Sequence, residues 1–243
     1  MQYITPELTD FLAGIRANNN KEWFEQHKSI YLEKVDAPLK QMGELLFEPY
    51  QDIPDMMWKS ARIYKDANFP PYLHYRDTMY IYIRHPAEWW NKTPTLFLEL
   101  SPEGACYGFR IATPEPAFMQ YFRDAISEDA QPFQEIIKTL EQFELVLTGD
   151  EYKRAKPCQN PELLPFFKKK SLEVKEVCPI GGKLYSDGFL QDVADVLQKC
   201  YPIYEYLYNL MQEYQAMKDS PAPKEERSNI PHMVQAPKHD FMW

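Results

Sequence analysis

Three arginines lie in segments of the chain that are typical of β-strands. Arg62, Arg84 and Arg110 each stand in a run rich in β-branched and aromatic side chains. Side chains of a strand point alternately to the two faces of a sheet, so the three guanidinium groups can share one face. Guanidinium groups bind phosphate and carboxylate groups through two parallel hydrogen bonds. The spacing therefore predicts a site for an anionic ligand.

The same alternation places tyrosines and a glutamate beside these arginines. Gly108 lies on this face as well and would let a ligand approach the backbone closely. The remaining residues that we expect on the face are Tyr64, Tyr80, Tyr82 and Glu99. The adjoining loop carries three charged residues that we expect at the rim of the site, namely Asp66, Arg76 and Asp77.

A second interpretation of this face requires no ligand. Antiparallel sheets often leave one face in water, where Glu99 and the tyrosines would form cross-strand pairs with the arginines. The first interpretation predicts a protein that binds or processes a small phosphate- or carboxylate-bearing metabolite. The alternative is a non-enzymatic module that binds an unidentified protein through exposed aromatic residues or through its C-terminal tail. The sequence does not decide whether the chain is an enzyme.

The segments that carry these residues predict a sheet. Runs of β-branched and aromatic residues at 57–65, 78–84, 95–101 and 105–111 indicate four strands, and 172–178 indicates an edge strand. Pro102-Glu103-Gly104 is a tight-turn sequence, so the strands on either side of it form an antiparallel hairpin. The face opposite the arginines is apolar, with Met79, Ile81 and Ile83 as examples, and should lie under the helices.

Helix signals occupy both ends of the chain. Thr5-Pro6 and Asn20 start two helices, and Pro38 is expected to kink or split the second. Thr113-Pro114-Glu115 starts a further helix, and others are expected from Gln131, over 160–167 and after a Ser186-Asp187 cap, the last kinked or broken at Pro202. The prediction is an α+β fold: a central, mainly antiparallel sheet covered by helices on one face. Residues 1–218 form a single domain, and 219–243, with four prolines and no periodicity, form a flexible tail.

Composition excludes several classes of function. The net charge of −9 argues against broad binding to nucleic acid, and the basic run Lys168-Lys169-Lys170 is interpreted as a solvated charge run. No signal peptide and no apolar stretch of about 20 residues is present, which predicts a cytoplasmic protein with no membrane attachment. The five histidines and four cysteines form no metal-binding or redox pattern. We therefore expect no metal, no cofactor and four free thiols.

The order of motifs resembles a bacterial family known as domain of unknown function 2461. The matching segments are Asn18 to Phe24, Arg62 to Phe69, Tyr75-Arg76-Asp77, Leu98 to Gly104 with Tyr107-Gly108, Tyr152-Lys153-Arg154 and Lys168 to Ser171. The resemblance covers residues 5–215 and implies an α+β fold, but it supplies no reaction.

Two departures from the family pattern fall in one loop. Asn68 stands where the family usually has a second arginine, and Pro70 to His74 replaces a loop that usually carries two lysines. A family activity that uses this loop would be altered in this chain.

Overall fold

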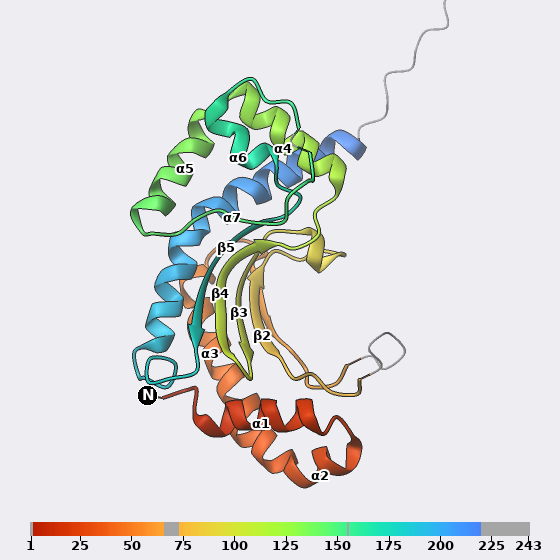
Figure 1. The fold of residues 1–243 in the computed structure, drawn as a ribbon, viewed down its shortest axis with the longest axis vertical. Coiled ribbons are helices and arrows are strands. Elements are labelled where there is room, and N and C mark those ends of the chain that lie inside the picture. The colour runs from red at the N-terminus through yellow and green to blue at the C-terminus, as the bar shows by residue number, and fades with distance from the viewer. Residues whose placement is uncertain (1, 66–72, 155, 220–243) are drawn as a thin grey trace, which may run out of the picture.

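A five-stranded antiparallel sheet forms the centre of the molecule, as seen in a computed structural model that describes residues 2–65, 73–154 and 156–219 (Figure 1). Within these residues the strands follow one another across the sheet in chain order. Their bounds are β1 (Met57–Ser60), β2 (Met79–Arg84), β3 (Thr95–Ser101), β4 (Gly104–Ile111) and β5 (Leu172–Pro179). The α+β prediction and the edge position of β5 are confirmed.

The first strand is shorter than predicted. β1 ends at Ser60, and the chain then leaves the sheet to pair with the segment that precedes β2. Tyr64 and Tyr75 form an isolated antiparallel bridge, and the N–H of Arg76 donates to the carbonyl of Ile63 at 2.8 Å. The N–H of Ala61 still donates to the Tyr80 carbonyl of β2 at 2.8 Å, whereas Ile63 and Lys65 form their backbone hydrogen bonds outside the main sheet. The strict alternation expected from 57 to 65 stops at this point.

The two faces of the sheet differ as the alternation predicts. One face carries buried apolar side chains, among them Ile81, Leu98 and Phe109. Helices α3 (Ala37–Phe47) and α7 (Phe189–Asp219) pack against this face. The opposite face is concave and is not covered by a helix in Figure 1. Burial of the apolar face is the main contribution that holds the sheet to the helices.

Gly108 lies in the middle of β4 with a φ of 145°, a conformation that side-chain-bearing residues rarely adopt. A Cβ atom at this position would lie 2.1 Å from the carbonyl oxygen of Val174 in β5. Glycine inside a strand permits such a local bend, and bends of this kind curve a sheet. Gly108 thus contributes to the concave shape of the sheet.

The N-terminal helices lie at one end of the sheet. They comprise α1 (Pro6–Ala17), α2 (Lys21–Ile30), the π-helical segment η1 (Tyr31–Asp36) and α3, followed by η2 (Glu48–Tyr50). Asn20 caps α2 as predicted, because its side chain accepts from the N–H of Trp23. Pro38 does not split the helix. The wide π turn before it carries an Ala37 N–H to Leu32 carbonyl bond, and this turn accommodates a residue that cannot donate.

The remaining helices cover the other end. They are η3 (Trp90–Lys92), α4 (Pro116–Glu128), α5 (Gln131–Gln142), η4 (Pro161–Leu163) and α6 (Leu164–Phe167), together with α7. Glu115, not Thr113, precedes α4. Of the kink or break expected at Pro202, the break does not occur, because α7 is continuous through this residue. The expected cap at Ser186 was wrong, because its hydroxyl donates to the Lys183 carbonyl. Helix α7 is described to Asp219, so the first residue of the predicted tail 219–243 is helical, and the rest of the tail lies outside the described residues. No described helix has the length and apolarity needed to cross a bilayer.

Candidate anion-binding hollow

A hollow of about 190 Å³ opens on the concave face of the sheet. We call it the arginine hollow. Six of the residues predicted for the site line it, namely Arg76, Tyr80, Tyr82, Arg84, Glu99 and Arg110. Strand register explains their meeting: Tyr80 lies opposite Glu99, Tyr82 opposite Phe97, and Thr95 opposite Arg110. Residues opposite one another in adjacent strands share a face, so the three strands β2, β3 and β4 bring these side chains together.

Arg84 is the most buried charged group of the hollow. Only 6% of its surface is exposed, and its guanidinium lies 4.7 Å from the centre of the Tyr82 ring. One terminal nitrogen donates to the Thr93 hydroxyl at 3.3 Å, whereas Nε has no hydrogen-bond partner. No carboxylate in the part of the chain that the structure describes forms an ion pair with it. A buried guanidinium normally has both an ionic and a hydrogen-bonding partner.

The other two arginines of the hollow also lie over aromatic rings. Arg110 is 4.1 Å from the centre of the Phe97 ring, and Arg76 is 5.5 Å from that of Tyr80. Arg110 forms an ion pair with Glu99 at 3.3 Å. Ring contacts hold a guanidinium plane without neutralising its charge. Three arginines and one glutamate therefore leave the hollow with two net positive charges in a chain whose net charge is −9.

Other predicted site residues lie elsewhere. Arg62 lines a separate surface hollow with Lys40 and Glu44 of α3, because β1 ends before it. Tyr64 is 58% exposed and packs its edge against Phe24. Asp77 forms an ion pair outside the arginine hollow, as described below, and Gly108 shapes the sheet. Asp66 lies outside the described residues.

The sequence interpretation also missed residues that line the hollow. Phe97 lies two residues before Glu99 in β3, so strand alternation already predicts that both side chains point to the same face. Asn91 and Thr93 come from the connection between β2 and β3. No local pattern marks them, since their position depends on how this connection folds over the sheet.

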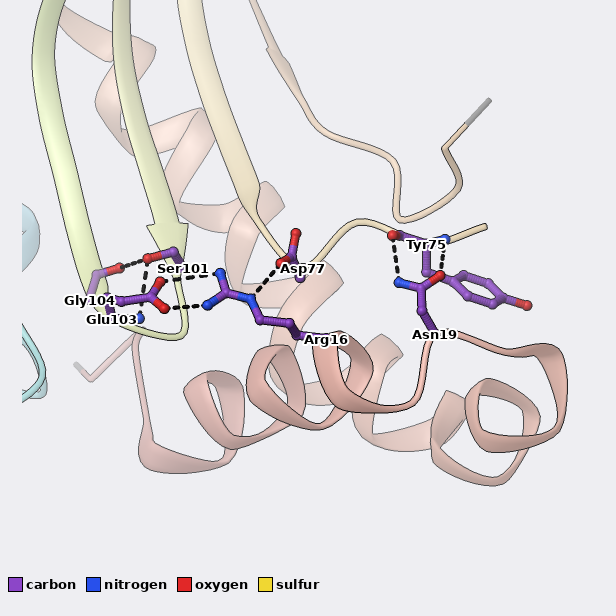
Figure 2. A network of polar contacts seen from close by, with 7 residues as sticks. All are labelled: Arg16, Asn19, Tyr75, Asp77, Ser101, Glu103 and Gly104. Atoms are coloured by element: carbon purple, nitrogen blue, oxygen red, sulfur yellow. Dashed lines mark hydrogen bonds and ion pairs between the residues drawn. The ribbon is translucent and has the colours of Figure 1, made fainter. Parts of the chain in front are cut away.

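A network of polar contacts, shown in Figure 2 and here called the tether, joins α1 to the loop that carries Arg76. The Arg16 guanidinium donates to Asp77 at 2.5 Å and to both carboxylate oxygens of Glu103 in the β3–β4 turn. The Asn19 side chain donates to the Tyr75 carbonyl at 2.9 Å and accepts from the Tyr75 N–H at 3.0 Å. Residues on both sides of Arg76 are thus fixed, which places its side chain over the hollow.

The tether unites segments that carried the family resemblance. Asn19 belongs to the first motif, Tyr75 and Asp77 to the third, and Glu103 to the hairpin motif. The Tyr75 ring also stacks on Phe24 of the first motif, with ring centres 4.4 Å apart. These three motifs therefore meet in a structural connection beside the hollow, and only some of their residues reach the hollow itself.

Nucleophilic and metal chemistry find little support around the hollow. Cys106 lies opposite Glu99, and burial raises the pKa of its thiol to about 11, so it stays protonated at neutral pH. Among the described residues no group of three histidine, cysteine, aspartate or glutamate side chains could hold a metal ion. The arrangement provides charge and hydrogen-bond donors rather than a covalent nucleophile.

His85 follows Arg84 but faces the helices. Its Nδ1 lies 2.7 Å from the Tyr204 hydroxyl, which also accepts the His85 backbone N–H at 2.9 Å. Tyr208 stacks on the imidazole at 3.8 Å between ring centres. Burial lowers the pKa of His85, so the ring is neutral at pH 7.

Comparison with known proteins assigns the chain to a family without assigning an activity. The sequence model of a family described as conserved hypothetical protein (DUF2461) matches residues 7–206, which is most of the chain. No curated protein matches it. The chain therefore belongs to the DUF2461 family of conserved hypothetical proteins.

Proposed function

We propose that this protein binds a small anionic ligand, bearing a phosphate or a carboxylate group, in the arginine hollow. The observation that carries the proposal is Arg84: a buried guanidinium whose Nε lacks an acceptor and whose charge lacks a described carboxylate partner. Removing a charge from water without a counter-charge is costly. A bound anion would supply both the missing acceptor and the missing charge.

The charge and shape of the hollow suit such a ligand. A phosphate monoester carries about −1.5 to −2 charges at pH 7, which matches two net positive charges. The hollow of about 190 Å³ is smaller than the roughly 300–1,000 Å³ usual for drug-sized ligands, which favours a small metabolite. The tyrosine and phenylalanine rings under the arginines hold the donors in place before the ligand arrives, and this lowers the entropy lost on binding.

The proposal concerns binding alone. Glu99, the one carboxylate of the hollow among the described residues, is engaged by Arg110, and Cys106 is a protonated thiol. A cytoplasmic location belongs to the same proposal. It is supported by the free state of all four cysteines, since disulfides form mainly in oxidising compartments.

A thermal-shift titration tests the proposal. The intact protein is melted at low salt with inorganic phosphate, phosphate monoesters and short carboxylates, beside chloride at equal ionic strength. Binding to the native state raises Tm with concentration. We expect a rise with at least one anion, its loss in Arg84→Met, and its retention in Arg62→Met, which removes an equal charge outside the hollow. No rise with any anion, or a rise unchanged in Arg84→Met, would overturn the proposal.

A further inference from the structure

The arginine hollow continues into a second hollow along the concave face. This second space, here called the side hollow, measures about 400 Å³ and shares Arg110 and Ala112 with the arginine hollow. Arg110 lies opposite Glu173 of β5, which lines the side hollow. The two spaces therefore adjoin across β4 and β5, with the Arg110 side chain at their boundary.

A short antiparallel pairing beyond β5 builds the wall of the side hollow. The N–H of Thr148 donates to the Glu173 carbonyl at 2.7 Å, and the N–H of Glu173 donates back at 3.0 Å. Gly149 has a φ of 141°, and a Cβ atom there would lie 2.0 Å from the Ser171 carbonyl oxygen. The Ser171 hydroxyl accepts the Asp150 N–H at 2.9 Å. These contacts fix the backbone that presents Asp150.

The side hollow differs from the arginine hollow in charge. Lys175 and Glu173 neutralise each other in an ion pair of 2.6 Å. The Asp150 carboxylate forms no ion pair with any residue in the described ranges, whereas Arg110 at the boundary is paired with Glu99. The space thus combines donors and acceptors without an excess of positive charge. Hydroxyl groups both donate and accept hydrogen bonds, and a carboxylate is a strong acceptor for them.

We propose that the ligand is a phosphorylated sugar or other polyol, with its phosphate at Arg84 and its hydroxyl groups in the side hollow against Asp150. This inference rests on the proposed function, because it takes the arginine hollow as the anion site. The positive hollow selects the phosphate, and the polar side hollow, which has no excess of positive charge, selects an uncharged hydroxyl-bearing part. One ligand spans both by passing Arg110.

Calorimetric titration of the intact protein with three probes tests the inference. The probes are inorganic phosphate, a hexose phosphate and an n-hexyl phosphate, which has a similar number of carbons but no hydroxyls. We expect the hexose phosphate to bind at least tenfold more tightly than either other probe. Asp150→Ala should remove this advantage and leave the affinity for inorganic phosphate unchanged. Asp10→Ala, which removes an exposed carboxylate from α1, is the matched control and should change neither affinity.

The outcomes separate the two proposals. Equal affinity for all three probes, or a hexose advantage that persists in Asp150→Ala, would overturn the sugar phosphate assignment while leaving anion binding intact. No binding of any probe would overturn the proposed function and this inference with it. Arg84→Met should abolish binding of every probe, whereas Asp150→Ala should affect the hexose phosphate alone.

Discussion

The tether and the arginine hollow use arginine in opposite ways. Arg16 in the tether is 43% exposed and contacts two carboxylates, Asp77 and Glu103. Arg84 in the hollow is 6% exposed. Among the residues that the structure describes, it forms no ion pair with a carboxylate, and its Nε has no hydrogen-bond acceptor. Water alone can solvate the exposed guanidinium of Arg16, whereas the buried guanidinium of Arg84 requires a protein or ligand partner. Asp77 and Glu103 therefore pair with the arginine whose ion pairs contribute less to the stability of the fold.

On the proposed function, this contrast distinguishes contacts that stabilise the fold from groups that bind the ligand. The tether connects α1, the Tyr75–Asp77 loop and the β3–β4 turn, so it fixes positions. The hollow concentrates uncompensated charge on the sheet, and under the proposed function this charge lowers the stability of the free protein and is compensated when the anion binds. If this division is correct, substitutions in the two regions should change different quantities.

The largest effect on stability is expected for Asn19→Ala in the tether. The substitution removes two hydrogen bonds to the backbone of Tyr75, which is buried, and leaves both backbone groups without partners. We expect a loss of about 2–3 kcal/mol in the free energy of unfolding, measured by urea denaturation. Asn18→Ala is the matched control, since Asn18 is exposed and its side chain donates to the Gly14 carbonyl within the same helix end. A loss equal to that of the control would show that the tether is not a stabilising element.

Arg84→Met should act in the opposite direction. Without a ligand, methionine fills similar space over Tyr82 and removes a buried charge that lacks a counter-charge. We expect the free energy of unfolding to rise by about 1 kcal/mol in urea denaturation, while anion binding is lost. A clear fall in stability would mean that Arg84 is a structural residue, and the division between the two regions would fail.

His85 provides a pH test next to the hollow. Its pKa in the folded protein is lowered by burial, so below its ordinary value of about 6.5 the unfolded chain binds the proton more readily. Stability is therefore complete above that value and falls as the pH decreases from it toward the folded pKa. Urea midpoints between pH 7.5 and 5 should show this fall. In His85→Gln the fall should be smaller, and an unchanged slope would contradict the assignment of a neutral, half-buried imidazole.

The smallest effect is expected for Arg16→Met. Its ion pairs are exposed to solvent, and pairs of this kind contribute roughly 0–1 kcal/mol and are screened by salt. We expect a loss of less than about 1 kcal/mol at low salt that shrinks further in 1 M sodium chloride. Anion binding in the hollow should change little, because Asn19 still holds Tyr75. A loss as large as that of Asn19→Ala would place the main stabilisation of the tether in its ion pairs.

The sequence by itself determined which strand side chains point to the concave face of the sheet. Strand alternation is local, so it already placed Tyr80, Tyr82, Arg84, Glu99 and Arg110 on one side and the apolar residues on the other. The hairpin between β3 and β4 followed from its turn residues for the same reason. Period-two geometry requires no knowledge of distant parts of the chain.

Only the tertiary structure decided which arginines share the hollow and which of them lack partners. Arg62 does not lie on the concave face because β1 ends at Ser60. Arg76 lies there because Asn19 and Arg16, far away in sequence, bind Tyr75 and Asp77 on either side of it. Thr93 contacts Arg84 because of the way the β2–β3 connection folds, and no local sequence pattern predicts this contact. Long-range contacts depend on how complete elements pack, so a pattern within any one segment does not contain them.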